Sequence, residues 1–200
     1  AMQTVERRGA IAAGHLLTAQ AGAEILRAGG NAYDAVIAAH FAACVVEPVL
    51  ASLGGGGFLL CQPSTGRPKV FDFFVQTPLR KTHREQCDFH PVLADFGEAQ
   101  QEFYIGLGAV ATPGAVKGMF EIHRRLGSMP MTELVQPAIE LARDGAEVNA
   151  LQAYIFNIVS PILLATSESR AVFSQSHADG VVQETQLLKM PNLADTLEHL

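Results

Sequence analysis

Residues 23–35 read Ala-Glu-Ile-Leu-Arg-Ala-Gly-Gly-Asn-Ala-Tyr-Asp-Ala, a pattern that predicts a junction between two helices. The paired glycines at 29 and 30 are typical of a helix C-terminus, because glycine adopts the left-handed backbone conformation without strain. Asn31 is a favoured N-cap residue, and Asp34 in the following turn suits the positive end of a helix. We therefore expect one helix over residues 18–28 and a second that begins at Asn31.

The second helix is expected to run to about Val46 and to be buried on most sides, because its residues are apolar nearly all round. Glu47 and Pro48 end it, since the residue before a proline is biased away from the helical conformation. A buried Glu47 carboxylate needs a partner or a raised pKa, and we favour a structural hydrogen bond to loop amides over a functional role. We interpret His40 as a hydrogen-bonded core histidine rather than a catalytic base.

Four consecutive glycines, residues 54–57, lead into the apolar stretch 58–61. A Pro-Ser-Thr-Gly turn follows, and residues 70–75 are again rich in Val and Phe. The two stretches predict a hairpin that forms a small buried sheet. Residues 9–14, which are small and apolar, are expected to add a short buried strand.

The glycine run has several possible roles. A phosphate-binding loop places its glycines between a strand and a helix, whereas these glycines precede a strand and no Gly-Lys-Ser/Thr follows them. We favour a close approach of two backbones at the strand entry, and keep oxyanion binding by exposed amides as an alternative. Ser52 lacks the flanking glycine and the following helix of a nucleophile elbow, which disfavours it as a nucleophile.

The rest of the chain is expected to be mostly helical. Residues 82–106 lose periodicity and become polar, which predicts a long loop or an excursion over the surface, and residues 174–180 predict a second loop. Apolar periodicity predicts helices over residues 110–126, 131–144, 149–159, 161–165 and 193–200. Together with the hairpin, these elements predict a helix-rich α+β fold.

The composition excludes several classes of protein. Hydrophobic residues make up 48% of the 200 residues, enough for the core of one large domain or two small ones. A net charge of -6 without a strong Lys/Arg cluster argues against nucleic acid as a partner. The longest apolar run, residues 35–46, is too short to span a bilayer, and no signal segment is recognisable, so we expect a cytoplasmic protein. The three widely spaced cysteines form no disulfide framework.

One group of residues has the composition of a metal site. His83, Cys87, Asp88 and His90 lie close together in the sequence, and a loop could bring such ligands to one ion. No second Cys/His pair follows them, and polar loops collect these residue types without binding metal. We therefore expect neither a metal ion nor another cofactor.

Five segments occur in the order in which they occur in gamma-glutamyltranspeptidases, and together they cover nearly the whole chain. The segments that resemble this family are residues 23–35, residues 45–48 with 53–58, residues 111–118, residues 134–142 with Asp144 and Gly145, and residues 191–197. Each segment is weak by itself, but their combination is specific. The chain thus resembles the N-terminal part of the large subunit of that family, over residues 1–200.

The resemblance implies an αββα N-terminal-nucleophile hydrolase fold and an activity in glutathione metabolism. In this family a precursor cleaves itself, and the threonine that becomes the new N-terminus of the small subunit attacks the amide of the substrate. The implied reaction is hydrolysis of a gamma-glutamyl or other acyl amide, or transfer of its acyl group. No catalytic residue can then be placed in this chain, and the implied partner is the missing C-terminal or small-subunit part.

The sequence departs from the family at a position that binds substrate. The family usually reads Asp-x-Arg-Glu-x-x-Pro where residues 72–78 read Asp-Phe-Phe-Val-Gln-Thr-Pro. In the family this arginine binds the alpha-carboxylate of the substrate, a pairing for which a guanidinium is well suited. The resemblance therefore implies substrate contacts at Phe74, Val75 and Gln76, with Arg80 as a substitute cation. Since an apolar pair cannot bind a carboxylate, we expect an altered substrate choice.

Two functions remain open from the sequence. The first is a gamma-glutamyltransferase-like amide hydrolase or acyl transferase with a less polar acyl group. The second is a non-catalytic scaffold or ligand-binding relative that kept the fold. Because a missing half would leave apolar faces exposed, self-association of this chain is also expected.

Overall fold

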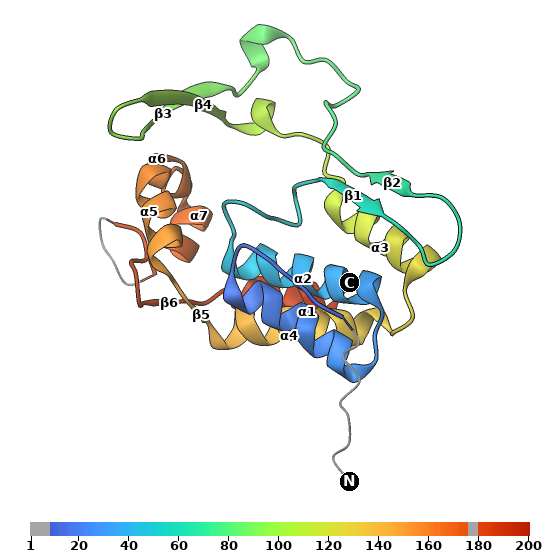
Figure 1. Cartoon of the computed structure of the whole chain (residues 1–200). Helices are drawn as coiled ribbons and strands as arrows, with labels where there is room; N and C mark the ends of the chain where they lie inside the picture. The colour runs from blue at the N-terminus through green and yellow to red at the C-terminus, as the bar shows by residue number, and fades with distance from the viewer. Residues whose placement is uncertain (1–8, 176–179) are drawn as a thin grey trace.

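Helices dominate the computed structural model, which describes residues 9–175 and 180–200 (Figure 1). The α-helices are α1 (Leu16–Ala28), α2 (Ala32–Val46), α3 (Ala115–Leu126), α4 (Met131–Asp144), α5 (Ala150–Ile158), α6 (Ser160–Leu163), α7 (Ser167–Phe173) and α8 (Pro191–Glu198). The strands are β1 (Phe58–Cys61), β2 (Lys69–Asp72), β3 (His90–Asp95), β4 (Gln100–Ile105), β5 (Ala146–Glu147) and β6 (Leu187–Leu188). Short 3-10 helices span Arg84–Gln86 and Leu107–Ala109. This composition confirms the α+β class.

The junction between α1 and α2 follows the sequence prediction closely. Gly29 ends α1 with φ at 100°, in the left-handed region, and its N–H donates to carbonyls of the last turn. The side chain of Asn31 accepts hydrogen bonds from Tyr33 and Asp34 N–H, while Asp34 accepts from Asn31 N–H, forming a complete capping box. α1 begins two residues before the expected Thr18, because the His15 side chain caps Leu17 N–H at 3.1 Å.

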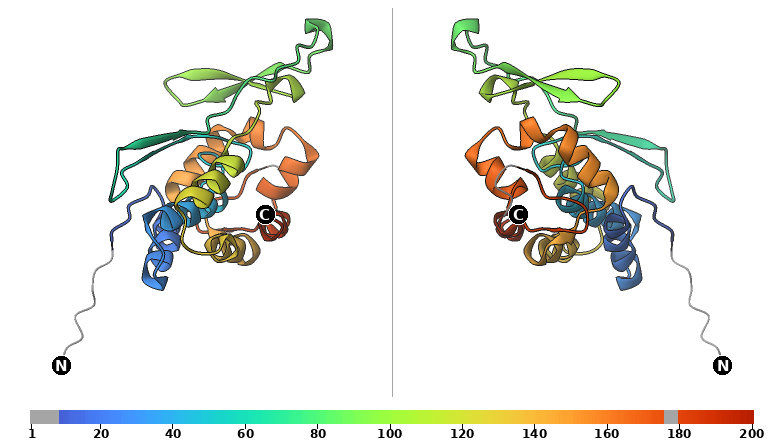
Figure 2. Two further views of the ribbon diagram at one scale, coloured as in Figure 1. Left: turned by 90° about the vertical axis from the view of Figure 1, so that its right-hand side faces the viewer. Right: turned by 90° about the vertical axis from the view of Figure 1, so that its left-hand side faces the viewer.

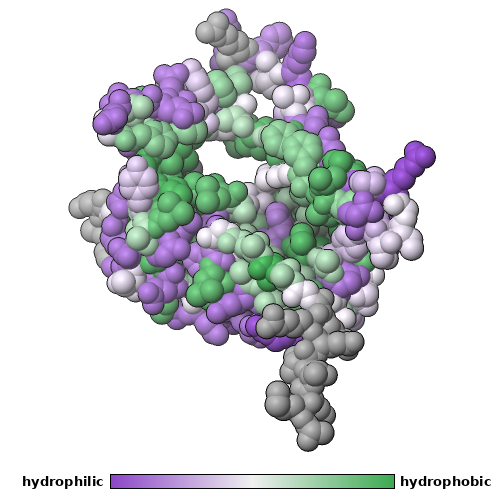
Figure 3. Space-filling view, viewed as in Figure 1, coloured by the Kyte–Doolittle hydropathy of each residue, from purple (hydrophilic) through white to green (hydrophobic). Residues whose placement is uncertain are grey.

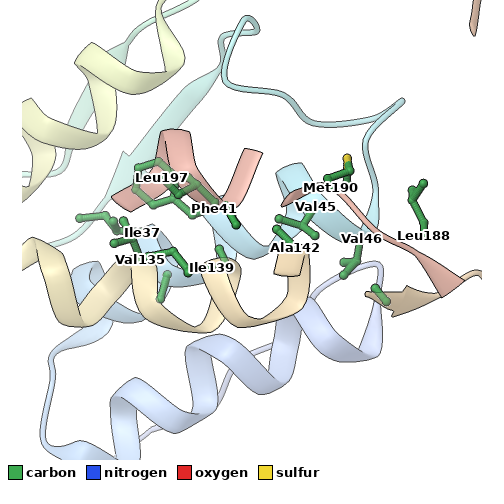
Figure 4. Packing of buried hydrophobic residues seen from close by; sticks show 14 of the residues in the cluster. Ile37, Phe41, Val45, Val46, Val135, Ile139, Ala142, Leu188, Met190 and Leu197 are labelled. Carbon is green, nitrogen blue, oxygen red and sulfur yellow. The ribbon is translucent and has the colours of Figure 1, made fainter. Parts of the chain in front are cut away.

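The core is built around α2, which packs against α1 and α4, while α4 packs against α8. Side chains of α2 point toward those of α4 and α8 (Figure 4). Phe41 and Ile37 are fully buried there, next to Leu134 of α4 and Leu197 of α8. α2 is therefore buried on most sides, as its apolar sequence predicts. The chain continues from its C-terminal end into the glycine run, residues 54–57.

The β1–β2 hairpin lies beside α3 and is paired antiparallel from Phe58 opposite Asp72 to Cys61 opposite Lys69. Leu59 and Phe71 are half-buried toward the helices, whereas Phe58 and Leu60 are more than 60% exposed. The expected sheet therefore forms, but only one of its faces is covered. The reason is that β1 alternates between a face that contacts helices and an outer face that stays largely exposed.

The prediction of a long loop over residues 82–106 is wrong. This segment contains the antiparallel hairpin β3–β4, which pairs His90 with Ile105 and Asp95 with Gln100 (Figure 2). Asp95 accepts a hydrogen bond from Gly97 N–H at 2.8 Å, and Gly97 itself has φ at 88°, which closes the turn. Most of the hairpin is exposed, so its sequence lacks the apolar alternation by which strands are recognised.

Two smaller features also differ from the expectations, and part of a third expectation is not tested. Residues 9–14 form no strand and are mostly exposed, because no neighbouring strand pairs with them. Helix α7 was not anticipated, since its short polar sequence lacks an apolar face. Residues 176–179, part of the expected loop 174–180, lie outside the described residues. No helix among the described residues is long and apolar enough to cross a membrane.

Candidate substrate-binding loop

Residues 73–76 leave β2 and are held by backbone pairing on two sides. Phe73 N–H donates to the carbonyl of Gly57 at 3.0 Å, and Gly57 N–H donates to Phe73 at 3.3 Å. Gln76 and Thr112 exchange a second pair of hydrogen bonds, at 3.1 and 2.7 Å. The short loop thus lies between the glycine run and the segment that leads into α3. We call residues 73–76 the substrate loop, after the contacts that the family resemblance implies.

The glycine run lets these backbones approach closely. A Cβ atom on Gly56 would lie 2.5 Å from the carbonyl oxygen of Phe73 and 2.6 Å from the nitrogen of Val75. A Cβ atom on Gly114 would lie 2.0 Å from the same Phe73 oxygen. The carbonyl of Gly55 also accepts hydrogen bonds from Gly114 N–H and from the first amide of α3, both at 3.0 Å. The predicted close backbone approach is therefore confirmed.

Phe74 presents its ring at the exposed side of the substrate loop. The ring is 51% exposed and stacks on Phe58, with centroids 5.4 Å apart and an interplanar angle of 14°. Its N–H donates to Asp72 Oδ1 at 3.0 Å, which fixes the turn that begins the loop. Val75 is half-buried and Gln76 exposed. The three predicted contact residues are therefore consecutive on one ordered loop, with an aromatic surface where the family has a cation.

Arg80 lies further along the exposed segment that leaves this loop. Among residues 9–175 and 180–200, no hydrogen bond or ion pair to the Arg80 side chain is present. The structure does not join Arg80 to Phe74, so its role as a substitute cation stays a prediction.

A hollow of about 360 Å³ lies between the end of α2 and the glycine run. His40, Leu50 and Ser52 are among the residues that line it, together with Gly55 and Gly56. Burial lowers the pKa of His40, so its imidazole is neutral at neutral pH. The sequence does not connect His40 with Ser52, because no local pattern shows that the loop after α2 folds back over His40. In the view of Figure 3, hydrophobic side chains gather around an opening in the molecule.

A second hollow, of about 450 Å³, lies between β2 and α3 and was not predicted. Its charged residues include Glu121 and Arg125, which form an ion pair one turn apart on α3. Hydrogen bonds from Arg124 and Arg125 lower the pKa of Glu121 to about 2. Arg125 also lies 5.7 Å from the centroid of the Phe71 ring. Glu121 and Arg125 thus pair with each other, whereas Lys117, which also lines this hollow, forms no ion pair among the described residues.

Two polar groups singled out in the sequence have structural roles. The Asp88 carboxylate accepts a hydrogen bond from Leu107 N–H at 2.9 Å, and its Oδ1 lies 3.4 Å from His90 Nδ1. No group of three or more metal-ligating side chains occurs among the described residues. Glu47 is buried as expected, but its partner is the hydroxyl of Thr18, at 2.8 Å, and not the loop amides. The partner differs because α1 packs directly alongside the end of α2.

Comparison with known proteins agrees with this geometry. Residues 18–200 match the family described as gamma-glutamyltranspeptidase. The acylase ACY 1 proenzyme of Pseudomonas sp. (strain V22) is 38% identical over 158 residues, which cover 76% of this chain and 27% of that protein. The glutathione hydrolase proenzyme of Escherichia coli (strain K12) is 33% identical over 194 residues, or 96% of this chain and 32% of that protein.

The fold agrees as well. The crystal structure of Helicobacter pylori gamma-glutamyltranspeptidase superimposes with a TM-score of 0.81 at 29% identity, covering 96% of this chain and 53% of that one. The chain therefore spans about a third or less of the length of these curated relatives and about half of the solved chain. With its helical core, its glycine-supported loop and the match over residues 18–200 in agreement, this chain belongs to the gamma-glutamyltranspeptidase family.

Proposed function

We propose that this chain forms the first part of the large subunit of an amide hydrolase or acyl transferase whose acyl group is less polar than gamma-glutamyl. The observation that carries the proposal is the substrate loop, where Phe74 stacks on Phe58 at the position of the family's arginine. An exposed aromatic pair favours an apolar group by burying its surface, and it offers no hydrogen bond to a carboxylate.

The relatives support the same interpretation. One of the most similar curated proteins is named an acylase, and others are named glutathione hydrolases, so the family includes more than one acyl specificity. Both the acylase and the Escherichia coli enzyme are named proenzymes. By analogy, we place the nucleophilic threonine in sequence outside these 200 residues, and we expect it to be exposed by self-cleavage.

The first test is processing and turnover of the protein expressed from its complete natural reading frame. Intact-mass measurement is expected to show two fragments, the smaller of which begins with threonine. The processed protein is expected to hydrolyse hexanoyl p-nitroanilide faster than gamma-glutamyl p-nitroanilide. Faster hydrolysis of the gamma-glutamyl compound would overturn the proposed substrate choice. A single uncleaved mass without turnover would favour the non-catalytic scaffold.

A substitution at the substrate loop tests the specificity directly. Phe74→Arg together with Val75→Glu restores the family's pair, and a hydrogen bond to a charged group contributes about 1.5–3 kcal/mol. The expected gain in kcat/KM for gamma-glutamyl p-nitroanilide is roughly tenfold to hundredfold. Phe74→Leu is the matched control, because it changes the ring without adding a cation. An equal gain in the control would contradict the argument.

A further inference from the structure

We propose that the hollow between α2 and the glycine run is a subsite for the side chain of the acyl group, and that it takes a short uncharged chain bearing a hydrogen-bond acceptor. The inference rests on the proposed function, because it assigns a substrate class to the same loop. Its position, its charge and its free donors each support it.

The hollow adjoins the substrate loop through one residue. Gly56 lines the hollow and also lies against the backbone of Phe73 and Val75, so that a Cβ atom on Gly56 would come within 3 Å of both. The space that a side chain at Gly56 would take is thus filled by the backbone of the substrate loop. The loop and the hollow both adjoin Gly56, so a substrate held at the loop has the hollow next to it.

The lining carries no formal charge. Val49, Leu50 and Ala51 supply apolar surface, and no Lys, Arg, Asp or Glu lines the hollow among the described residues. The imidazole of His40, which burial keeps neutral, completes the wall. A charged group placed here would lose hydration without gaining a partner of opposite charge, so the lining selects an uncharged ligand. The volume, about 360 Å³, lies at the small end of the range for small-molecule pockets, about 300–1,000 Å³.

Free and hydrogen-bonded N–H groups alternate along the glycine run. Gly55 N–H donates to Ser52 O at 3.1 Å and Gly57 N–H to Phe73 O, whereas Gly54 and Gly56 N–H donate to nothing in the described part of the chain. The exposed hydroxyl of Ser52 lies beside them. Gly56 and Ser52 line this uncharged hollow, and Gly54 lies between them in the sequence. Their free N–H groups and hydroxyl suit a carbonyl or hydroxyl oxygen on an otherwise aliphatic chain.

The test is binding of hexanamide to isotopically labelled protein, followed by the amide resonances of Gly54 and Gly56. Both resonances are expected to shift and saturate with hexanamide, and to respond at least tenfold more weakly to hexanoate. Ala51→Trp, which fills the hollow, is expected to weaken hexanamide binding at least tenfold. Ala171→Trp is the matched control on the exposed surface of α7 and is expected to leave the affinity within twofold of the unmodified protein.

Ser52→Ala, which removes one donor without adding volume, covers the case in which Ala51→Trp fails to fold, and is expected to weaken binding about threefold. Unshifted glycine resonances, tighter binding of hexanoate, or unchanged affinity in both variants would overturn the subsite. Turnover of hexanoyl p-nitroanilide without hexanamide binding would refute the subsite and leave the proposed function intact. Binding without any processing or turnover would show that the hollow takes this ligand, but it would refute the proposed function and with it the role of the hollow as an acyl subsite.

Discussion

Replacing Asp34 by Asn is expected to destabilise this protein strongly, because the Asp34 carboxylate joins two parts of the fold. The carboxylate is fully buried. Its Oδ2 accepts from Asn31 N–H at 2.9 Å and from the hydroxyl of Ser128, while its Oδ1 accepts from Ser128 N–H at 2.9 Å and Met129 N–H at 3.4 Å. The side chain thus caps α2 and fixes the turn between α3 and α4.

The magnitude follows from the donors that Asn leaves unpaired. An amide has one acceptor oxygen, so two of these donors would face an NH2 group. Each buried donor without a partner costs about 1–3 kcal/mol, so two such donors predict a loss of roughly 2–6 kcal/mol in the free energy of unfolding. The control is Asp144→Asn at the exposed end of α4, for which the expected change is within about 0.5 kcal/mol.

The effect is also expected to depend on pH. Burial acts to raise the pKa of Asp34, but hydrogen bonds from Ser128, Asn31 and Met129 outweigh it and hold the pKa below its usual value. A carboxyl whose pKa is lowered on folding stabilises the protein above its unfolded pKa, about 3.9, and this contribution is lost as the pH falls through the folded pKa. The difference in the free energy of unfolding between the unmodified protein and the Asp34→Asn variant should therefore be constant above about pH 5 and shrink below about pH 4.

The assay is urea unfolding followed by circular dichroism at 222 nm, from pH 7 down to pH 3. An Asp34→Asn protein within about 0.5 kcal/mol of the unmodified protein at pH 7 would refute the network as a source of stability. A gap that stays constant down to pH 3 would refute the assigned charge state, because a protonated Asp34 offers fewer acceptors to the same donors.

Three further predictions concern the glycine run, the exposed hairpin face and the cysteines. Gly56→Ala is expected to lower the stability measured in thermal unfolding by about 1–3 kcal/mol, because its Cβ would overlap the substrate loop. Gly54→Ala is the near-neutral control, because the nearest atom to its Cβ would be Ser52 Oγ at 3.9 Å. Equal stability of the two variants would contradict this reasoning. If the chain self-associates as expected, Phe58→Ser should lower the mass that light scattering measures, since the ring is 63% exposed on the outer face of the hairpin. An unchanged mass would argue against that face. Burial raises the pKa of the Cys44 thiol to about 12. Iodoacetamide at pH 8 should therefore modify the less buried Cys87 first and Cys44 only on unfolding. Early labelling of Cys44 would refute its burial.

Most of the helices were predictable because their signals are local, α7 being the exception. The Asn31 cap, the Gly29 C-terminus and the Asn149 cap of α5 each act within four residues of chain, so the sequence alone places these helix ends within one or two residues. The hairpin β3–β4 was missed for the opposite reason. Its strands are mostly exposed, and a pattern of apolar residues exists only where one face is buried.

The candidate site was predictable only in part. The family resemblance pointed to Phe74 and its neighbours, and the four glycines indicated close packing at a strand entry. Neither indicated which backbone would approach, because Gly114, which meets the same Phe73 carbonyl from the other side, lies almost sixty residues further along the chain. The hollow beside His40 was invisible in the sequence for the same reason.

Residue types and local spacing thus account for the helix ends, the buried character of α2 and the apolar pair at residues 74 and 75. The three-dimensional packing accounts for the support of the substrate loop, the Asp34 network and the hollow at Gly56. Capping and amphipathicity act between residues a few positions apart, and a single sequence records them. Contacts such as Asp34 with Ser128, or Gly56 with Val75, form only when distant segments meet, and no local pattern encodes that meeting.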